Sequence, residues 1–142
     1  MRRTLGVGIV LLLLATLSPD AALGQRSGER SSRLKGNYPN PFNPTTTISF
    51  TLFEEDLRGG QPAVVSIKIF NVFHQLIAVP RALRHPNGDA LVENLPYTSA
   101  GDWEAYWDGT DKKGRKVASG VYLYQLEVNG VREPPRRMIV TK

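Results

Sequence analysis

The chain has no cysteine among its 142 residues. Disulfide bonds, thiolate metal sites, cysteine nucleophiles and lipid anchors on cysteine are therefore excluded. The length also excludes a multidomain enzyme, because it suffices for about one domain. The excess of positive charge is modest: 18 basic and 13 acidic side chains give a formal net charge of +5, so the chain is not a polycation. With 41% hydrophobic and 22% charged residues, the composition is typical of a globular protein stabilised by packing alone.

Long hydrophobic runs are missing except near the N-terminus. Arg2 and Arg3 precede an apolar run over residues 7–17, and a small-x-small pattern follows at residues 22–24. The run has about half the ~20 residues that a membrane-spanning helix needs. We therefore expect residues 1–24 to be a cleaved signal peptide, with an uncleaved anchor as the alternative. This predicts a protein exported to the periplasm, cell surface or extracellular space, without stable membrane insertion.

After the signal peptide, residues 25–36 are polar and rich in serine and arginine, which predicts a flexible leader. The hydrophobic period then changes to two, as in half-buried strands, and no 3.6-residue repeat is sustained. The expected strands include residues 48–52, 65–69, 76–79, 90–95, 103–107, 122–128 and 138–140. We therefore predict an all-β fold over residues 37–142, an immunoglobulin-like antiparallel β-sandwich of about seven strands.

Turn residues separate these runs. Asn-Gly at 129–130 favours a two-residue type I′ hairpin, and Asp-Lys-Lys-Gly at 111–114 favours a type I turn. Asn-Gly at 87–88 indicates a third turn. The Ser-Gly pair at 119–120 lies in an apolar run, which predicts a bulge or a close backbone approach.

A proline-rich segment, the proline strip, precedes the first predicted strand. It consists of Asn37, Tyr38, Pro39, Asn40, Pro41, Phe42, Asn43 and Pro44. Three prolines remove amide donors, so the strip must lie along an edge or across the end of the sandwich. We expect Tyr38 and Phe42 to pin it to the core, and its asparagines to bind nearby backbone. A strip that closes the sandwich is the favoured interpretation, and direct recognition by transport machinery is the alternative.

The sequence Trp107-Asp108-Gly109 predicts a buried indole, a carboxylate that accepts from turn amides, and a glycine that lets the chain reverse. Asp108, Thr110 and Asp111 also gather oxygen atoms, so we considered calcium binding. Their spacing does not match the D-x-[DN]-x-[DN]-G loop, and the two lysines that follow would repel a cation. A folding motif is therefore favoured.

These segments, residues 37–50 and 107–122, together with 65–72 and 137–142, resemble the C-terminal sorting domain of type IX secretion cargo. The pattern is also similar to the immunoglobulin-like domain of flagellar hook-capping proteins. The family-signature residues are Asn37, Tyr38, Pro39, Asn40, Pro41, Phe42, Asn43, Pro44, Trp107, Asp108, Gly109, Gly114, Ser119, Gly120, Tyr122, Met138 and Lys142. The resemblance implies a β-sandwich that addresses its carrier across the outer membrane, with the secretion machinery as partner and no catalysis. His74 stands where the family usually has glycine.

Residue patterns for catalysis are sparse. His74 and His85 lack a zinc-ligand spacing and are expected at the surface or in turns. Ser119 lacks the G-x-S-x-G setting of a nucleophile elbow. Asp102 and Glu104 could mimic a glycosidase carboxylate pair, but more often such a pair is the solvated side of a strand. We therefore expect no enzyme activity, no metal and no cofactor.

Basic residues cluster at 112–116 and 132–137, where solvated turns and strand edges are favoured over a nucleic-acid site. Three functions remain open. The first is a sorting or surface-targeting module. The second is a free-standing structural or adhesive module that binds a surface protein, because no passenger domain stands between the expected signal peptide and the sandwich. The third is a carbohydrate-binding module that uses Tyr97 or Tyr106 as a stacking platform.

Overall fold

The computed structural model describes residues 32–142. The predicted signal peptide (1–24) and most of the predicted leader lie outside the described residues. The strands of the described part are β1 (Leu34–Tyr38), β2 (Thr46–Leu52), β3 (Ala63–Phe70), β4 (Leu76–Ala78), β5 (Arg81–Leu83), β6 (Leu95–Tyr97), β7 (Gly101–Trp107), β8 (Gly120–Val128), β9 (Val131–Arg132) and β10 (Arg136–Val140). Two short 3-10 turns, η1 (Glu54–Asp56) and η2 (Arg58–Gly60), connect β2 to β3.

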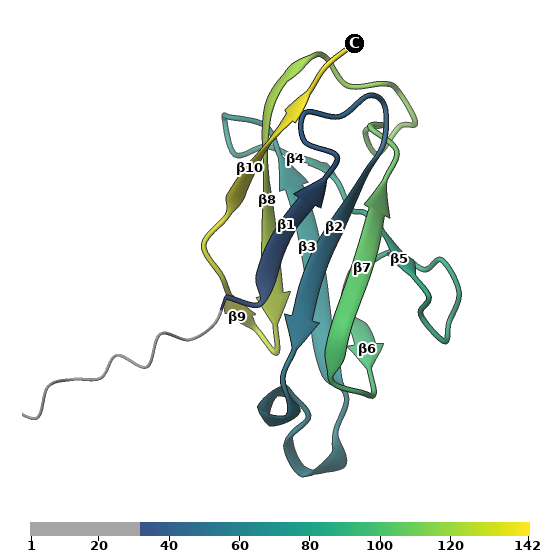
Figure 1. Ribbon diagram of the computed structural model, residues 1–142, viewed down its shortest axis with the longest axis vertical. Helices are drawn as coiled ribbons and strands as arrows, with labels where there is room; N and C mark the ends of the chain where they lie inside the picture. The colour runs from purple at the N-terminus through teal and green to yellow at the C-terminus, as the bar shows by residue number, and fades with distance from the viewer. Residues whose placement is uncertain (1–31) are drawn as a thin grey trace, which may run out of the picture. The chain divides into compact units, whose positions relative to one another are not determined.

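The strands form two packed antiparallel sheets, which confirms the predicted all-β sandwich (Figure 1). One sheet has the order β1-β2-β7-β5. The other has the order β10-β8-β3-β4, with β6 on β3 and β9 on β8. Ten strands are present in the described residues, against about seven predicted, because β1, β5, β6 and β9 are too short or too polar to show a period of two.

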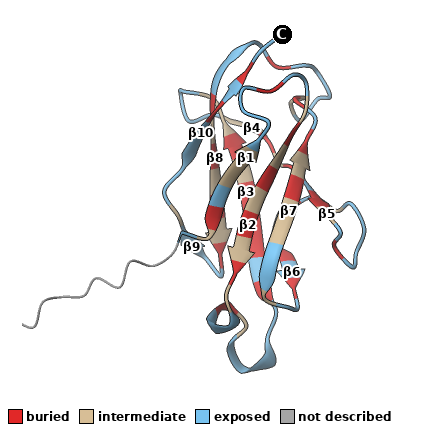
Figure 2. Cartoon of the chain, viewed as in Figure 1, coloured by how far each residue is buried: buried red, intermediate tan, exposed pale blue. Residues whose placement is uncertain are grey.

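The core lies between the sheets and follows the alternation of the sequence (Figure 2). Ile48, Phe50 and Leu52 face inward from β2, while the polar residues between them are half-buried. Ile67 on β3 and Leu126 on β8 approach from the opposite sheet and are fully buried. Each such side chain contributes about 1.5–3 kcal/mol by leaving water, which is the main force that holds a sandwich without disulfides together.

The chain between β3 and β7 crosses from one sheet to the other and back. β4 pairs with β3, and β5 then pairs with β7 in the opposite sheet. Leu91 forms only an isolated bridge to Arg81, and the chain returns to the six-stranded sheet as β6, which pairs with β3. The predicted strand over 90–95 is therefore wrong. β6 includes Pro96, which the sheet tolerates because β6 is an edge strand that needs no outward amide.

The predicted leader over 25–36 extends too far, because its last residues belong to the domain. Leu34 on β1 is 0% exposed. The Arg33 guanidinium lies 2.7 Å from a carboxylate oxygen of Asp56, and Glu133 accepts hydrogen bonds from the backbone amides of Arg33 and Leu34. Burial alone would raise the pKa of Asp56, but hydrogen bonds from Arg33 and the Phe53 amide lower it overall. This ion-pair cluster anchors the start of β1.

His85 is buried rather than at the surface, although it stands in the predicted turn. Its Nε2 lies 2.8 Å from the carbonyl oxygen of Pro96, and its Nδ1 accepts from the amide of Asn87. Because Nδ1 accepts, Nε2 is the donor to Pro96, and the ring packs on Tyr97 with 4.6 Å between the centroids. The amide of Gly88 donates to the His85 carbonyl at 2.9 Å, which confirms the turn at 87–88.

The hairpin predicted at 129–130 is confirmed. Asn129 and Gly130 both have positive φ, 50° and 79°, as a type I′ turn requires. The hairpin joins β8 to β9, after which β10 continues along the same edge of β8. The Asn129 side chain also accepts from the amide of Val64 and donates to the carbonyl of Asp56. This one residue therefore ties β3 and η1 to the hairpin.

Candidate functional site

The proline strip crosses the end of the sandwich, as expected, and binds the outer edge of β10. The amide of Phe42 donates to the carbonyl of Ile139 at 3.0 Å, and the amide of Thr141 donates back to Phe42 at 2.9 Å. The Asn40 side chain accepts from the amide of Ile139 at 3.0 Å. The strip thus replaces part of the missing strand ladder with one backbone bridge and one asparagine side chain.

Within the strip, Asn37 and Thr46 fix the first proline. Asn37 donates to Thr46 Oγ1 at 3.1 Å, and the Thr46 hydroxyl donates to the carbonyl of Pro39 at 2.9 Å. Thr46 is buried, and its hydroxyl is satisfied by these contacts. The Asn37 side chain also donates to the Pro39 carbonyl at 3.3 Å, which confirms the expected bond from an asparagine side chain to nearby backbone.

Phe42 anchors the strip in the core, whereas Tyr38 does not. The Phe42 ring packs edge-on against Trp107 at 5.5 Å, and Trp107 packs against Tyr122 at 5.8 Å. Tyr38 is 82% exposed, so the expectation that it pins the strip is wrong. Tyr38 ends β1, and its side chain is left on the outside.

Gly109 is where the strip and the Trp107 turn touch. Its φ is +76°, and a Cβ at this position would lie 2.5 Å from the carbonyl oxygen of Pro44. Only a glycine therefore allows the two backbones to approach so closely. The Trp107 indole, which is buried, donates to the carbonyl of Thr110 at 2.8 Å. Asp108 accepts from the Thr110 amide and hydroxyl at 3.0 and 2.6 Å, as predicted.

The type I turn at 111–114 is confirmed by the hydrogen bond from the Gly114 amide to the Asp111 carbonyl, at 2.9 Å. The Asp111 carboxylate accepts from the amides of Arg115 and Lys113 and from the Arg115 guanidinium. These hydrogen bonds lower the pKa of Asp111, and the one from the Arg115 amide has the largest effect. The carboxylates of Asp108 and Asp111 thus accept hydrogen bonds from donors of their own loop, as expected of a motif that stabilises the fold.

The remaining signature residues lie on β8 and β10. Tyr122 donates its hydroxyl to the Ala118 carbonyl at 2.9 Å, and Met138 is fully buried. Gly120 pairs with Val140 without a register shift, and a Cβ added at Gly120 would have no atom within 4 Å. The predicted bulge or close approach at 119–120 is therefore wrong. Lys142 is exposed beyond β10.

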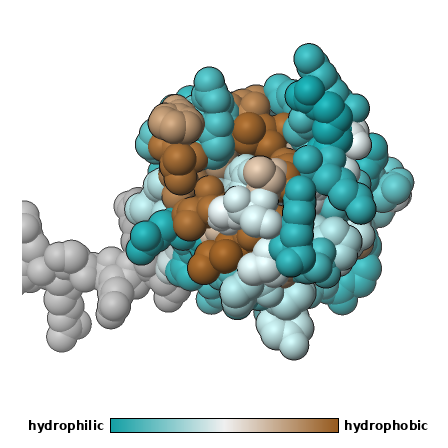
Figure 3. Space-filling model, turned by 90° about the horizontal axis from the view of Figure 1, so that it is seen from above, coloured by the Kyte–Doolittle hydropathy of each residue, from teal (hydrophilic) through white to brown (hydrophobic). Residues whose placement is uncertain are grey.

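Figure 3 looks onto this end of the molecule, where apolar side chains show among hydrophilic ones. The exposed hydrophobic residues at the β3–β4 turn are Val72 and Phe73, the latter 80% exposed. His74, in the same turn, has φ of 59°, a left-handed conformation that glycine adopts most easily. The histidine at this position therefore adopts a backbone conformation that is more usual for glycine.

The two carboxylates considered for catalysis, both on β7, have separate partners on other segments. Asp102 accepts from the Thr51 hydroxyl at 2.6 Å, and Glu104 pairs with Arg84 at 2.7 Å. In the described part of the chain, no group of histidine, aspartate or glutamate side chains is arranged to hold a metal ion. Among the same residues, no helix has the length and apolar character to cross a membrane.

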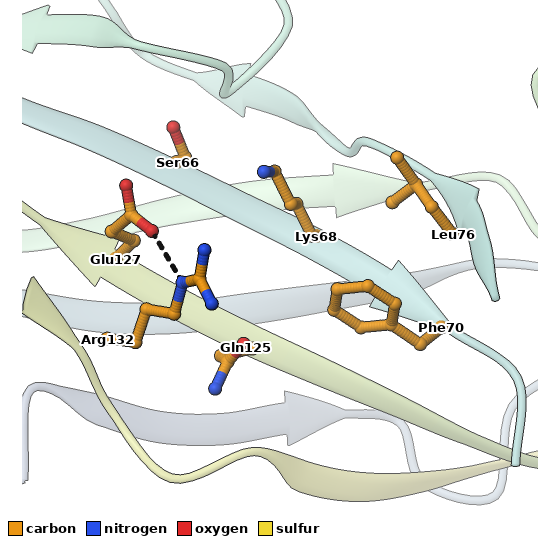
Figure 4. Close-up of a pocket in the computed structure, with 7 residues that line it drawn as sticks. All are labelled: Ser66, Lys68, Phe70, Leu76, Gln125, Glu127 and Arg132. Carbon is orange, nitrogen blue, oxygen red and sulfur yellow. Dashed lines mark hydrogen bonds and ion pairs between the residues drawn. The ribbon is translucent and has the colours of Figure 1, made fainter. Parts of the chain in front are cut away.

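Two hollows lie outside the strip. One, of about 550 Å³, has Tyr106 in its wall together with Arg81 and Glu93. Tyr97 is 1% exposed and cannot serve as a stacking platform, which leaves Tyr106 alone for that role. The other, of about 210 Å³, lies on the outer face of the six-stranded sheet, where the Glu127–Arg132 pair spans 3.0 Å (Figure 4).

Comparison of the chain with known protein families, with curated proteins and with solved structures finds no match.

Proposed function

We propose that this chain is an exported, non-enzymatic β-sandwich module that serves as a sorting or surface-targeting domain of a type IX secretion system. One observation supports the proposal. The signature segments, which are far apart in the sequence, converge on one end of the sandwich, where Phe42, Trp107 and Tyr122 stack and Gly109 meets Pro44. The resulting surface is held by these contacts and is unlike a sheet face, so it suits recognition by shape.

The proposal locates recognition on the exposed groups of that end. Tyr38 and Lys142 both lie there and are exposed, whereas Phe42 and Trp107 are buried and hold the surface in place. The periplasm or cell surface is the place of action, and the secretion machinery of the outer membrane is the partner.

The test is a fusion of residues 32–142 behind a periplasmic reporter in a host with a type IX system. The fusion begins at Ser32 because Arg33 and Leu34 belong to the domain. We expect the reporter at the cell surface. Tyr38→Ala combined with removal of Lys142 should reduce surface display, and Val131→Ala, at an exposed site on β9, is the matched control. A folded fusion that stays in the periplasm would contradict the proposal.

A free-standing adhesive module is the second candidate, because Phe73 and Val72 form an exposed apolar turn. Here a surface protein is the partner. Capture of one stable surface partner by the chain, lost on Phe73→Ser and retained on Tyr38→Ala, would favour this candidate over sorting.

A further inference from the structure

Between β1 and β10 the sandwich has a polar groove of about 340 Å³. Its walls are formed by Gly36, Asn37, Asn40, Tyr124, Arg136 and Arg137. Arg136 Nη1 donates across the gap to the Lys35 carbonyl at 2.7 Å, and Asn40 binds the Ile139 amide farther along β10. These two bridges mark the ends of the groove, so its width is set by the fold.

The groove offers hydrogen-bond donors and positive charge. Two guanidinium groups line it, and no acidic side chain does. The Asn40 carboxamide oxygen is engaged with Ile139, which leaves its NH₂ group as a further donor. A negatively charged group therefore fits this lining, and a carboxylate matches the planar fork of an arginine.

Tyr124 adds an uncharged donor to the two arginines. The residue is 1% exposed, and this small exposed part lines the groove. Burial raises the pKa of Tyr124, with the charge of Arg136 opposing, so the phenol keeps its proton and can donate. Among the described residues, the buried hydroxyl that lacks a partner is that of Tyr97, so the Tyr124 hydroxyl reaches the open groove and can donate to a group bound there.

The backbone of β10 also has an open position there. The amide and carbonyl of Ile139 face outward, toward Asn40 and Phe42. Backbone groups two residues apart on a strand face the same way, so those of Arg137 face outward as well. The strip already pairs with β10 through Phe42, which bridges Val140 in parallel. Beside Arg137 this pairing stops, and β1, the neighbouring edge, has β2 as its strand partner among the described residues.

We propose that the groove between β1 and β10 binds an extended peptide segment of a partner protein, which pairs with the Arg137 backbone and places a carboxylate side chain against Arg137 and Tyr124. A peptide suits the open amide and carbonyl of the edge, which an isolated phosphate or sulfate group would leave unused. The inference does not depend on the sorting proposal, because it concerns binding by the isolated chain.

The test measures binding of a fluorescent octapeptide of alternating threonine and valine with one central glutamate to the full-length chain. Matched peptides carry glutamine instead of glutamate, or N-methylated backbone amides. We expect the glutamate peptide to bind about tenfold more tightly than the glutamine peptide, because an ionised acceptor strengthens the hydrogen bonds. N-methylation should abolish binding, and added salt should weaken it.

Variants assign the contacts. Arg137→Gln, at an exposed side chain, should remove the preference for glutamate, and Tyr124→Phe should weaken binding about fivefold. Arg132→Gln, at an exposed pair outside the groove, is the control and should bind as the unmodified chain does. If Tyr124→Phe fails to fold, Arg137→Gln alone decides the test.

Three results would overturn the proposal. The first is equal binding of the glutamate and glutamine peptides. The second is that inorganic phosphate binds the chain and none of the peptides does, which would assign the groove to a lone anion. The third is self-association of the chain that Arg137→Gln abolishes, which would assign it to a second copy.

Discussion

The contact between Gly109 and the proline strip permits a quantitative prediction from a single methyl group. Gly109→Ala places an L-residue at φ +76°, which costs about 1–2 kcal/mol. Its Cβ would also lie 2.5 Å from the Pro44 carbonyl oxygen, and the strip would have to move. Crowding of this kind costs about 1–3 kcal/mol. We therefore expect Gly109→Ala to lower the free energy of unfolding by about 2–5 kcal/mol.

Gly114→Ala separates the two contributions. Gly114 has nearly the same φ, +78°, but no atom lies within 4 Å of its Cβ position. It should therefore lose only the conformational part, about 1–2 kcal/mol. Urea denaturation followed by tryptophan fluorescence measures both variants, since the buried indole of Trp107 adjoins Gly109. Equal losses in the two variants would refute the close approach of strip and turn.

Three further predictions concern other parts of the domain. Phe42→Ala should cost about 3–5 kcal/mol in urea denaturation, whereas Tyr38→Ala, at an exposed ring, should change stability by less than about 0.5 kcal/mol; similar losses would contradict the assignment of one anchor. Leu34→Ala should cost about 2–5 kcal/mol and make β1 susceptible to limited proteolysis; unchanged stability and cleavage would contradict the place of Leu34 in the core. Folding lowers the pKa of Asp56 from its ordinary value of 3.8. The ion pair of Asp56 with Arg33 therefore stabilises the fold fully above pH 3.8, and this stabilisation is lost as the pH falls through the lower pKa of the folded state. Asp56→Asn should therefore lower stability at neutral pH and flatten its decline in acid, as denaturation at a series of pH values would show.

The long strands could be predicted from the sequence because their side chains are sorted by a single burial pattern. β2 alternates buried and half-buried residues, and β8 does so from Tyr122 to Val128. β1 could not be found this way, because Leu34 is its one buried residue and polar residues surround it. Its place in the fold depends on Arg33, whose carboxylate partners stand 23 and 100 residues away in the sequence.

Part of the candidate site was also within reach of the sequence. Proline, asparagine and glycine act through local backbone geometry, so the strip and the turn after Trp107 could be assigned to the end of the sandwich. The groove was not visible, because it depends on two strand edges from opposite ends of the chain. In the sequence, Arg136 and Arg137 are typical of a solvated strand edge, and Tyr124 is typical of the core. The pairing of β10 with β8 brings these three residues together.

The directions of β1 and β10 bear on how the domain carries mechanical load. Both strands run the same way, so the chain enters the domain beside Glu133 and leaves it past Val140 at the opposite end (Figure 1). Tension between Ser32 and Lys142 is therefore directed along the strands. It shears the β1–β2 and β10–β8 ladders simultaneously instead of unzipping one bond after another, and the sandwich resists extension while it is pulled.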